Sequence, residues 1–221
     1  MPGDLDEAEM NTEEIIRALA ADSKERSLSM SAAWWVAAGV AVALAVAVFF
    51  MTLGPRADIA AAFETPRFLF KFAITIALAA SAFGLVRSLS RPGGTWRNAA
   101  PFLATAPAVL ALAVLVEMFL LPQDMWAARL VGTNSLVCLA FIPLIGMGPL
   151  AFFLLALRHG APTRPALGGA VAGVLAGGIA ATLYAAHCTD DSPLFIAAWY
   201  SMAIAGLAAL GALGAKRIVR W

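Results

Sequence analysis

The chain has 221 residues, of which 62% are apolar and 13% are charged, and its formal net charge is +1. A soluble domain is about 45–50% apolar and about 25% charged, so this composition argues against a globular cytoplasmic enzyme and favours a protein that lies in the lipid bilayer. The small net charge argues against direct nucleic-acid binding of the usual basic kind. The 2 cysteines are too few for a disulfide scaffold or a four-thiolate zinc site.

A polar, acidic tail over residues 1–30 precedes the first apolar run. Within it, Asn11 followed three residues later by a glutamate is typical of a helix N-cap with its returning carboxylate. Three apolar side chains then fall on one face of a short helix, which is marginal in water on its own. Two interpretations stay open: a solvated lead-in to the first span, or an amphipathic segment that binds a partner protein in a groove. The residues that would make this contact are Glu14, Ile15, Ile16 and Leu19.

Six apolar stretches are long enough to cross the bilayer, because a spanning helix needs about 20 residues. The sequence therefore predicts an all-α membrane protein with six transmembrane helices. We expect the acidic tail to be followed by a transmembrane domain over residues 31–215 and a basic C-terminus over 216–221. In chain order the six stretches cover residues 32–53, 68–86, 102–121, 136–157, 166–187 and 194–213.

The lysines and arginines are divided unevenly between the two sides of this predicted bundle. With six spans, 11 of the 15 lie on the side that holds both termini. Cytoplasmic loops of membrane proteins carry an excess of Lys and Arg. We therefore expect both termini in the cytoplasm.

The two cysteines fall at similar depth near the outer ends of neighbouring spans. Cys138 is the third residue of the fourth stretch, and Cys188 directly follows the fifth. A short loop joins these two stretches on the other side, so their helices should be neighbours. In an oxidising periplasm this placement favours a pair with a redox or metal role, although two buried space-filling thiols remain the alternative.

Other polar residues lie close to Cys188 in the sequence. His187, Asp190 and Asp191 are possible auxiliary ligands if a soft metal ion binds the two thiols. No close ligand spacing is present, so the sequence indicates no resident cofactor and at most a transient heavy-metal ion at the cysteine pair.

Two further patterns concern helix packing and intramembrane charge. Gly169, Gly173 and Gly177 repeat every four residues and form a groove that favours close approach of a second helix, for which we expect the sixth span of the same chain rather than a dimer partner. Lys71 and Glu117 lie near the outer ends of consecutive spans, shallow enough to snorkel, and could form an ion pair near the interface.

An ordered set of segments resembles one known family. Together they resemble the NrsF-type family of proteobacterial membrane proteins, which are negative regulators of an extracytoplasmic-function sigma factor. The segments are MNTEEII at 10–16, NSLVC at 134–138, RHGAPTRP at 158–165, YAAHCTDDSP at 184–193, WY at 199–200 and RIVRW at 217–221.

The resemblance implies a non-enzymatic anti-sigma factor in the bacterial inner membrane. Its cytoplasmic side would hold the extracytoplasmic-function sigma factor, and its outer cysteines, Cys138 and Cys188, would sense oxidants or heavy-metal stress. Three alternatives stay open from the residues alone: a small metal or solute transporter, a thiol redox membrane protein, and a structural membrane subunit. The first would need a polar path at the midplane, where no ionisable residue lies. The second usually needs a closely spaced cysteine pair.

Overall fold

The structure is a computed structural model that describes residues 12–13, 16–17, 29–91, 93–94, 96–160 and 162–218. Within these residues the regular elements are all helical, and six helical segments are long and apolar enough to cross a membrane. This confirms the predicted all-helical class and the number of helices that are long and apolar enough to span a membrane. The six segments are α2 (Met30–Thr52), α4 (Pro66–Leu89), α5 (Trp96–Leu120), Gln123–Arg158, α8 (Pro165–Ala185) and Pro193–Ile218.

Two of these segments are composite. The fourth consists of the 3-10 turn η1 (Gln123–Met125), the short helix α6 (Trp126–Val131) and α7 (Ser135–Arg158). The sixth consists of α9 (Pro193–Phe195), the π-helical turn η2 (Ile196–Tyr200) and α10 (Ser201–Ile218). A π-turn inside a spanning helix rotates the residues on either side of it relative to each other and often occurs at functional sites.

The helices begin where local chemistry favours a start. The hydroxyl of Ser29 accepts a hydrogen bond from the Ala32 amide at 3.2 Å, which caps α2. Both α4 and α8 begin with a proline, Pro66 and Pro165, whose missing N–H is no loss in the first turn. α5 begins at Trp96, earlier than the predicted 102, because the helix already includes the polar residues before the apolar run.

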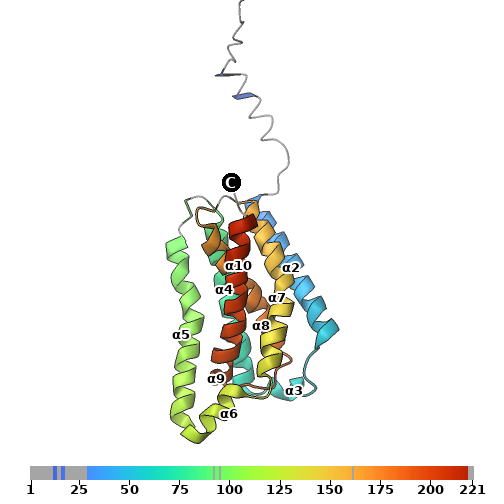
Figure 1. Cartoon of the computed structure of the whole chain (residues 1–221), viewed down its shortest axis with the longest axis vertical. Helices are drawn as coiled ribbons and strands as arrows, with labels where there is room; N and C mark the ends of the chain where they lie inside the picture. The colour runs from blue at the N-terminus through green and yellow to red at the C-terminus, as the bar shows by residue number, and fades with distance from the viewer. Residues whose placement is uncertain are drawn as a thin grey trace, which may run out of the picture.

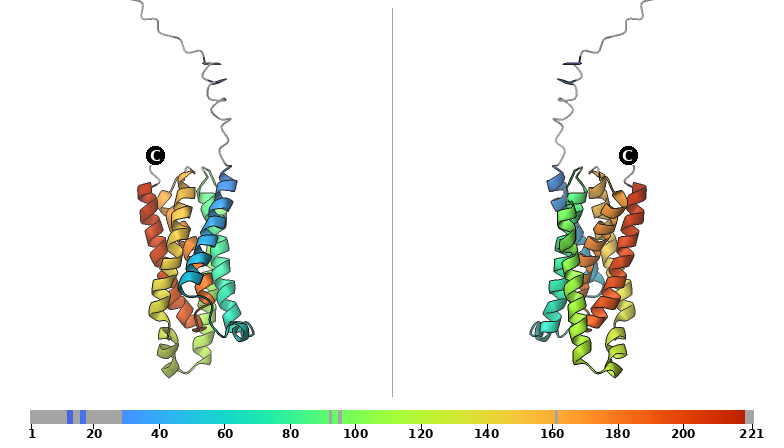
Figure 2. Two further views of the ribbon diagram at one scale, coloured as in Figure 1. Left: turned by 90° about the vertical axis from the view of Figure 1, so that its right-hand side faces the viewer. Right: turned by 90° about the vertical axis from the view of Figure 1, so that its left-hand side faces the viewer.

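The spans form an upright bundle with the start of α2 and the end of α10 at the same end (Figure 1). We call this the terminal end. The opposite end, called the far end, holds the short helix α3 (Ile59–Ala62), α6 and the connection 186–192, which we call the far-end loop. The side views of Figure 2 show the same arrangement. Both cysteines belong to the far end, Cys138 in the first turn of α7 and Cys188 in the far-end loop.

Helix α8 is the centre of the bundle, in contact with α10, α4, α7 and α2. Its glycines allow α10 to approach closely. A Cβ on Gly169 would lie 2.2 Å from the carbonyl oxygen of Gly211, and a Cβ on Gly173 would lie 2.2 Å from that of Leu207. A Cβ on Gly177 would lie 3.1 Å from the side chain of Ile204. The three glycines predicted to pack therefore lie against the sixth span of the same chain. In contrast, α5 lies at the edge and packs mainly on α4.

Candidate functional site

The far-end loop folds back over the bundle and carries Cys188 at its centre. The Cys188 amide donates to the Tyr184 carbonyl at 3.0 Å, which continues the last turn of α8. The thiol is fully buried and donates to the Asp190 carbonyl oxygen at 3.7 Å. The thiol of Cys188 is therefore held inward.

Two cations hold this loop through a backbone oxygen and a carboxylate. The Lys71 ammonium donates to the Cys188 carbonyl oxygen at 2.8 Å and lies 2.5 Å from an oxygen of Asp191. Arg56 donates to the same carbonyl oxygen and to the other Asp191 oxygen, both at 3.4 Å. Lys71 is fully buried, and the carboxylate of Asp191 compensates its positive charge there.

A second carboxylate ties the loop to the start of α7. One oxygen of Asp190 accepts from the Thr133 and Asn134 amides at 3.0 and 2.8 Å, and from the Asn134 side chain at 3.0 Å. Gly132 lets this carboxylate approach, because its φ is 58° and a Cβ there would lie 2.8 Å from Asp190 Cγ. Asp190 thus links the far-end loop to the residues that precede the first turn of α7.

Cys138 lies in that first turn and shares a network with Cys188. The Asn134 carbonyl oxygen accepts from the Cys138 amide at 2.8 Å and from the Tyr184 hydroxyl at 3.3 Å. Both cysteines are free and fully buried. The structure therefore brings the two predicted residues into one network as thiols without a disulfide.

The environment of Cys188 favours the protonated thiol. Burial raises the pKa of the Cys188 thiol, while the nearby Lys71 ammonium acts in the opposite direction. Because the thiolate is the form that attacks oxidants and binds metal ions, the resting site is poorly reactive. A reagent must therefore open the loop, or compete with the proton, to react with this sulfur.

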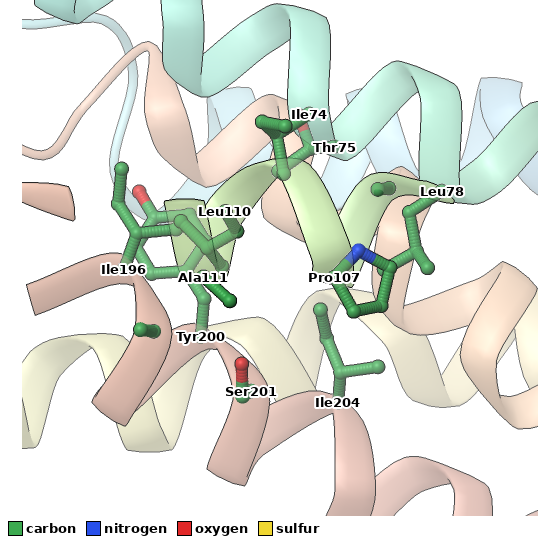
Figure 3. A pocket seen from close by; sticks show the side chains of 12 residues that line it. Ile74, Thr75, Leu78, Pro107, Leu110, Ala111, Ile196, Tyr200, Ser201 and Ile204 are labelled. Atoms are coloured by element: carbon green, nitrogen blue, oxygen red, sulfur yellow. The ribbon is translucent and has the colours of Figure 1, made fainter. Parts of the chain in front are cut away.

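Aromatic rings seal the inner side of the thiol site. The Tyr184 and Tyr200 rings pack edge to face with centroids 5.7 Å apart, and the Tyr184 carbonyl oxygen accepts from the Cys188 amide. Beyond Tyr200 lies a cavity of about 190 Å³ between α4, α5 and the sixth span. Figure 3 shows its labelled walls, including Ile74, Pro107 and Ile204, which are apolar. Thr75, Tyr200 and Ser201 add hydroxyl groups to this mostly apolar lining.

With this geometry in view, comparison with known proteins decides the family. Residues 19–221 match the family described as "NrsF: Negative regulator of sigma F". The chain belongs to the NrsF family. This confirms the resemblance carried by the segments around the two cysteines, and it places the chain in a regulatory rather than a catalytic family.

Two curated relatives of the NrsF family align over their whole length. The chain is 34% identical over 220 residues to "Anti-sigma-F factor NrsF" of Caulobacter vibrioides (strain NA1000 / CB15N), covering 96% of this chain and 100% of the relative. It is 31% identical over 214 residues to "Probable anti-sigma-F factor NrsF" of Azospira oryzae (strain ATCC BAA-33 / DSM 13638 / PS), with coverage of 96% and 100%. No solved structure matches the chain.

The residues proposed as auxiliary metal ligands have other partners in this NrsF-family chain. His187 Nδ1 lies 3.0 Å from the Gly54 carbonyl oxygen, and Asp190 and Asp191 are engaged by the contacts described above. Within the described ranges, no group of three or more His, Cys, Asp and Glu side chains could hold a metal ion. The sequence correctly placed these side chains near Cys188, but their hydrogen bonds stabilise the loop.

The predicted ion pair between Lys71 and Glu117 is wrong. Lys71 pairs with Asp191, whereas Glu117 accepts from the Ser192 hydroxyl at 2.7 Å and from the Leu194 amide at 3.0 Å. Both side chains are buried, at 0% and 4% exposure, so neither snorkels to the interface. Both charged groups bind residues of the far-end loop, Lys71 through Asp191 and Glu117 through Ser192, and they do not pair with each other.

Sequence reasoning missed the part played by Arg56, Tyr184 and Tyr200. Arg56 donates to both carboxylate oxygens of Asp58 at 2.6 Å and also reaches the Cys188 carbonyl oxygen and Asp191 at 3.4 Å. The tail prediction is largely outside the described residues, which do not include Glu14, Ile15 and Leu19. Ile16 is helical and 59% exposed. Because the other three residues lie outside the described part of the chain, binding of a partner by the tail stays a prediction.

Proposed function

We propose that this NrsF-family protein holds an extracytoplasmic-function sigma factor at its terminal end and releases it when Cys138 and Cys188 at the far end detect oxidative or heavy-metal stress. In this proposal the terminal end faces the cytoplasm of the inner membrane and the far end faces the periplasm. One observation carries it: two buried, free thiols share a network at the end of the bundle opposite the start of α2.

The charges support this orientation. Among the described residues, the far end carries fewer Lys and Arg side chains than the terminal end does. Two of those at the far end, Arg56 and Lys71, form ion pairs within the chain. An excess of Lys and Arg marks the cytoplasmic side of membrane proteins. At the terminal end the basic side chains are Arg87, Arg91, Arg97, Arg158, Arg164, Lys216 and Arg217.

A packed route leads from the thiols to the start of α2, where the tail joins. Helix α7 carries Cys138 at the far end and Phe153 near the terminal end, and Phe153 stacks on Trp34 of α2 with centroids 6.2 Å apart. The Trp34 indole donates to the Ser90 hydroxyl at 3.1 Å, which fixes α2 to the end of α4. Because packed helices change position in discrete steps, a shift of α7 would move α2 and the tail with it.

The chemistry at the thiols balances without a catalytic group. A soft divalent cation would replace the two thiol protons and bind both sulfurs. An external oxidant would instead accept two electrons as the two thiols lose their protons and form one S–S bond. Biasing a two-state equilibrium from 1:99 to 99:1 needs about 5.5 kcal/mol. A bound structural metal ion contributes about 10 kcal/mol or more, and a disulfide about 2–4 kcal/mol.

Copurification tests the binding half of this proposal. The full chain is purified in mild detergent from cells, next to a chain that lacks residues 1–28, with and without brief treatment with Cd²⁺. We expect a sigma factor to copurify with the full chain, to be lost on treatment, and to be absent from the truncated chain. A sigma factor that binds the truncated chain equally well would exclude the tail as the binding segment. No sigma factor with either chain would contradict the function.

A further inference from the structure

A groove between α4 and α5 remains outside the thiol site. Its volume is about 460 Å³, and it lies at the far end, where α4 begins and α5 ends. Its wall is apolar: Leu112, Val116 and Leu120 line it and are 61%, 49% and 76% exposed. Because α5 packs mainly on α4, this surface has no protein cover among the described residues.

Two charged side chains also line the groove. Glu117 is 4% exposed, and its Oε2 accepts from Ser192 and Leu194, but its buried Oε1 has no hydrogen-bond partner. A buried acceptor without a donor is unfavourable. Arg67, the second residue of α4, is exposed and has no hydrogen bond or ion pair to the described part of the chain. The groove is thus lined by an apolar wall, a buried carboxylate oxygen that has no donor, and an exposed arginine.

We propose that this groove binds one molecule of phosphatidylethanolamine. Its phosphate pairs with Arg67, its ammonium donates a hydrogen bond to Glu117 Oε1, and an acyl chain lies along Leu112, Val116 and Leu120. Both charged residues lie close to the ends of their spans, Arg67 in the first turn of α4 and Glu117 in the last turn of α5, which is the depth of lipid headgroups.

The charges select this headgroup among phospholipids. An anionic headgroup would satisfy Arg67 but would bring a second negative charge next to the Glu117 carboxylate. A choline headgroup carries a quaternary ammonium, which has no N–H to donate to Oε1. Only a zwitterionic lipid with a primary ammonium matches both groups. This inference does not depend on the proposed sigma-factor function.

The lipid would also bear on the far-end loop. Glu117 Oε2 holds Ser192 and Leu194, which directly follow Asp191 in the chain, and Asp191 binds Lys71. A headgroup that fixes the Glu117 carboxylate therefore also fixes the end of the loop that carries Cys188.

Native mass spectrometry of the purified full chain in detergent, after lipid removal, tests the site. The chain is titrated with phosphatidylethanolamine, phosphatidylcholine or phosphatidylglycerol of identical acyl chains. We expect one phosphatidylethanolamine per chain to bind about tenfold more tightly than either other lipid, a difference of about 1.4 kcal/mol. Equal binding of the three, or tighter binding of phosphatidylglycerol, would overturn the proposal.

Three variants test the residues. Glu117→Gln keeps the shape and one acceptor, and we expect it to abolish the preference for phosphatidylethanolamine over phosphatidylcholine. Arg67→Gln should weaken all three lipids, and Ala113→Leu should fill the groove and prevent binding without changing charge. Arg129→Gln, on α6 outside the groove, is the matched control and should bind as the unmodified chain does. If Glu117→Gln does not fold, unchanged binding by both other groove variants would still overturn the proposal.

Discussion

The ammonium of Lys71 donates a 2.8 Å hydrogen bond to the carbonyl oxygen of Cys188, 117 positions further along the chain. This bond links α4 to the loop that carries one of the two thiols, and Asp191 completes the site by neutralising the ammonium. The fully buried Lys71 therefore anchors the far-end loop to α4 through Cys188 and Asp191. The position of Cys188 depends on this ion pair.

Lys71→Met is expected to destabilise the protein strongly. The methionine keeps much of the volume but leaves Asp191 with only Arg56, and breaking one partner of a buried ion pair costs about 3–5 kcal/mol. Thermal unfolding of the purified chain, followed by circular dichroism or fluorescence, measures this effect. Arg129→Met is the control and should change the melting temperature little. Equal stability of the two variants would show that Lys71 does not hold the loop.

The alkylation of Cys188 is expected to depend steeply on pH. Burial raises the pKa of the Cys188 thiol above its ordinary value of 9.0, so little thiolate exists at neutral pH. In a Cys138→Ser background, the rate of reaction with N-ethylmaleimide should therefore still be rising as the pH passes 9.0. Mass spectrometry of the modified chain measures the rate. A rate that levels off below pH 8 would contradict the buried thiol.

The same proton affects stability. The folded chain holds the Cys188 proton more tightly than the unfolded chain does, so this contribution is fully present below the unfolded pKa and is lost as the pH rises above it. We expect the melting temperature to fall from about pH 9 upward, and to fall less in Cys188→Ser. Identical alkaline melting curves for both chains would show that the Cys188 thiol carries no such proton linkage.

The α8–α10 contact is expected to tolerate no added methyl group. Gly173→Ala would place its Cβ 2.2 Å from the Leu207 carbonyl oxygen, which must move, and overpacking of this kind costs about 1–3 kcal/mol. Gly206 on α10 is the matched control, since a Cβ there meets nothing within 4 Å. Gly206→Ala should therefore leave the melting temperature unchanged or raise it slightly. Equal behaviour of the two variants would contradict the close approach of these helices.

The route from α7 to the tail is tested at Trp34. Trp34→Phe removes the hydrogen bond to Ser90, worth about 1 kcal/mol, but keeps an aromatic ring against Phe153. We expect a smaller response to heavy-metal stress in a sigma-dependent reporter, with binding of the sigma factor unchanged before treatment. Trp35→Phe, at a residue 61% exposed, is the control. A full response from Trp34→Phe would place the route elsewhere.

Local patterns in the sequence predicted what local chemistry determines. Hydropathy located six spans, since each span needs only its own apolar residues. The spacing of Gly169, Gly173 and Gly177 indicated a packing groove, because three neighbouring turns of one helix form it. The partners of Lys71 and Glu117 were missed for the opposite reason. Both bind the far-end loop, partly through backbone groups, and a backbone carbonyl or amide leaves no residue-specific trace in the sequence.

The response of the two cysteine variants in the cell tests the central claim most directly. A strain that carries the Cys138→Ser, Cys188→Ser chain at normal abundance, with a sigma-dependent reporter, is exposed to Cd²⁺ or to a thiol oxidant. We predict that the reporter stays at its uninduced level, while the unmodified chain and an Arg129→Gln control permit induction. Induction of the double variant to the level of the unmodified chain would contradict sensing by these thiols.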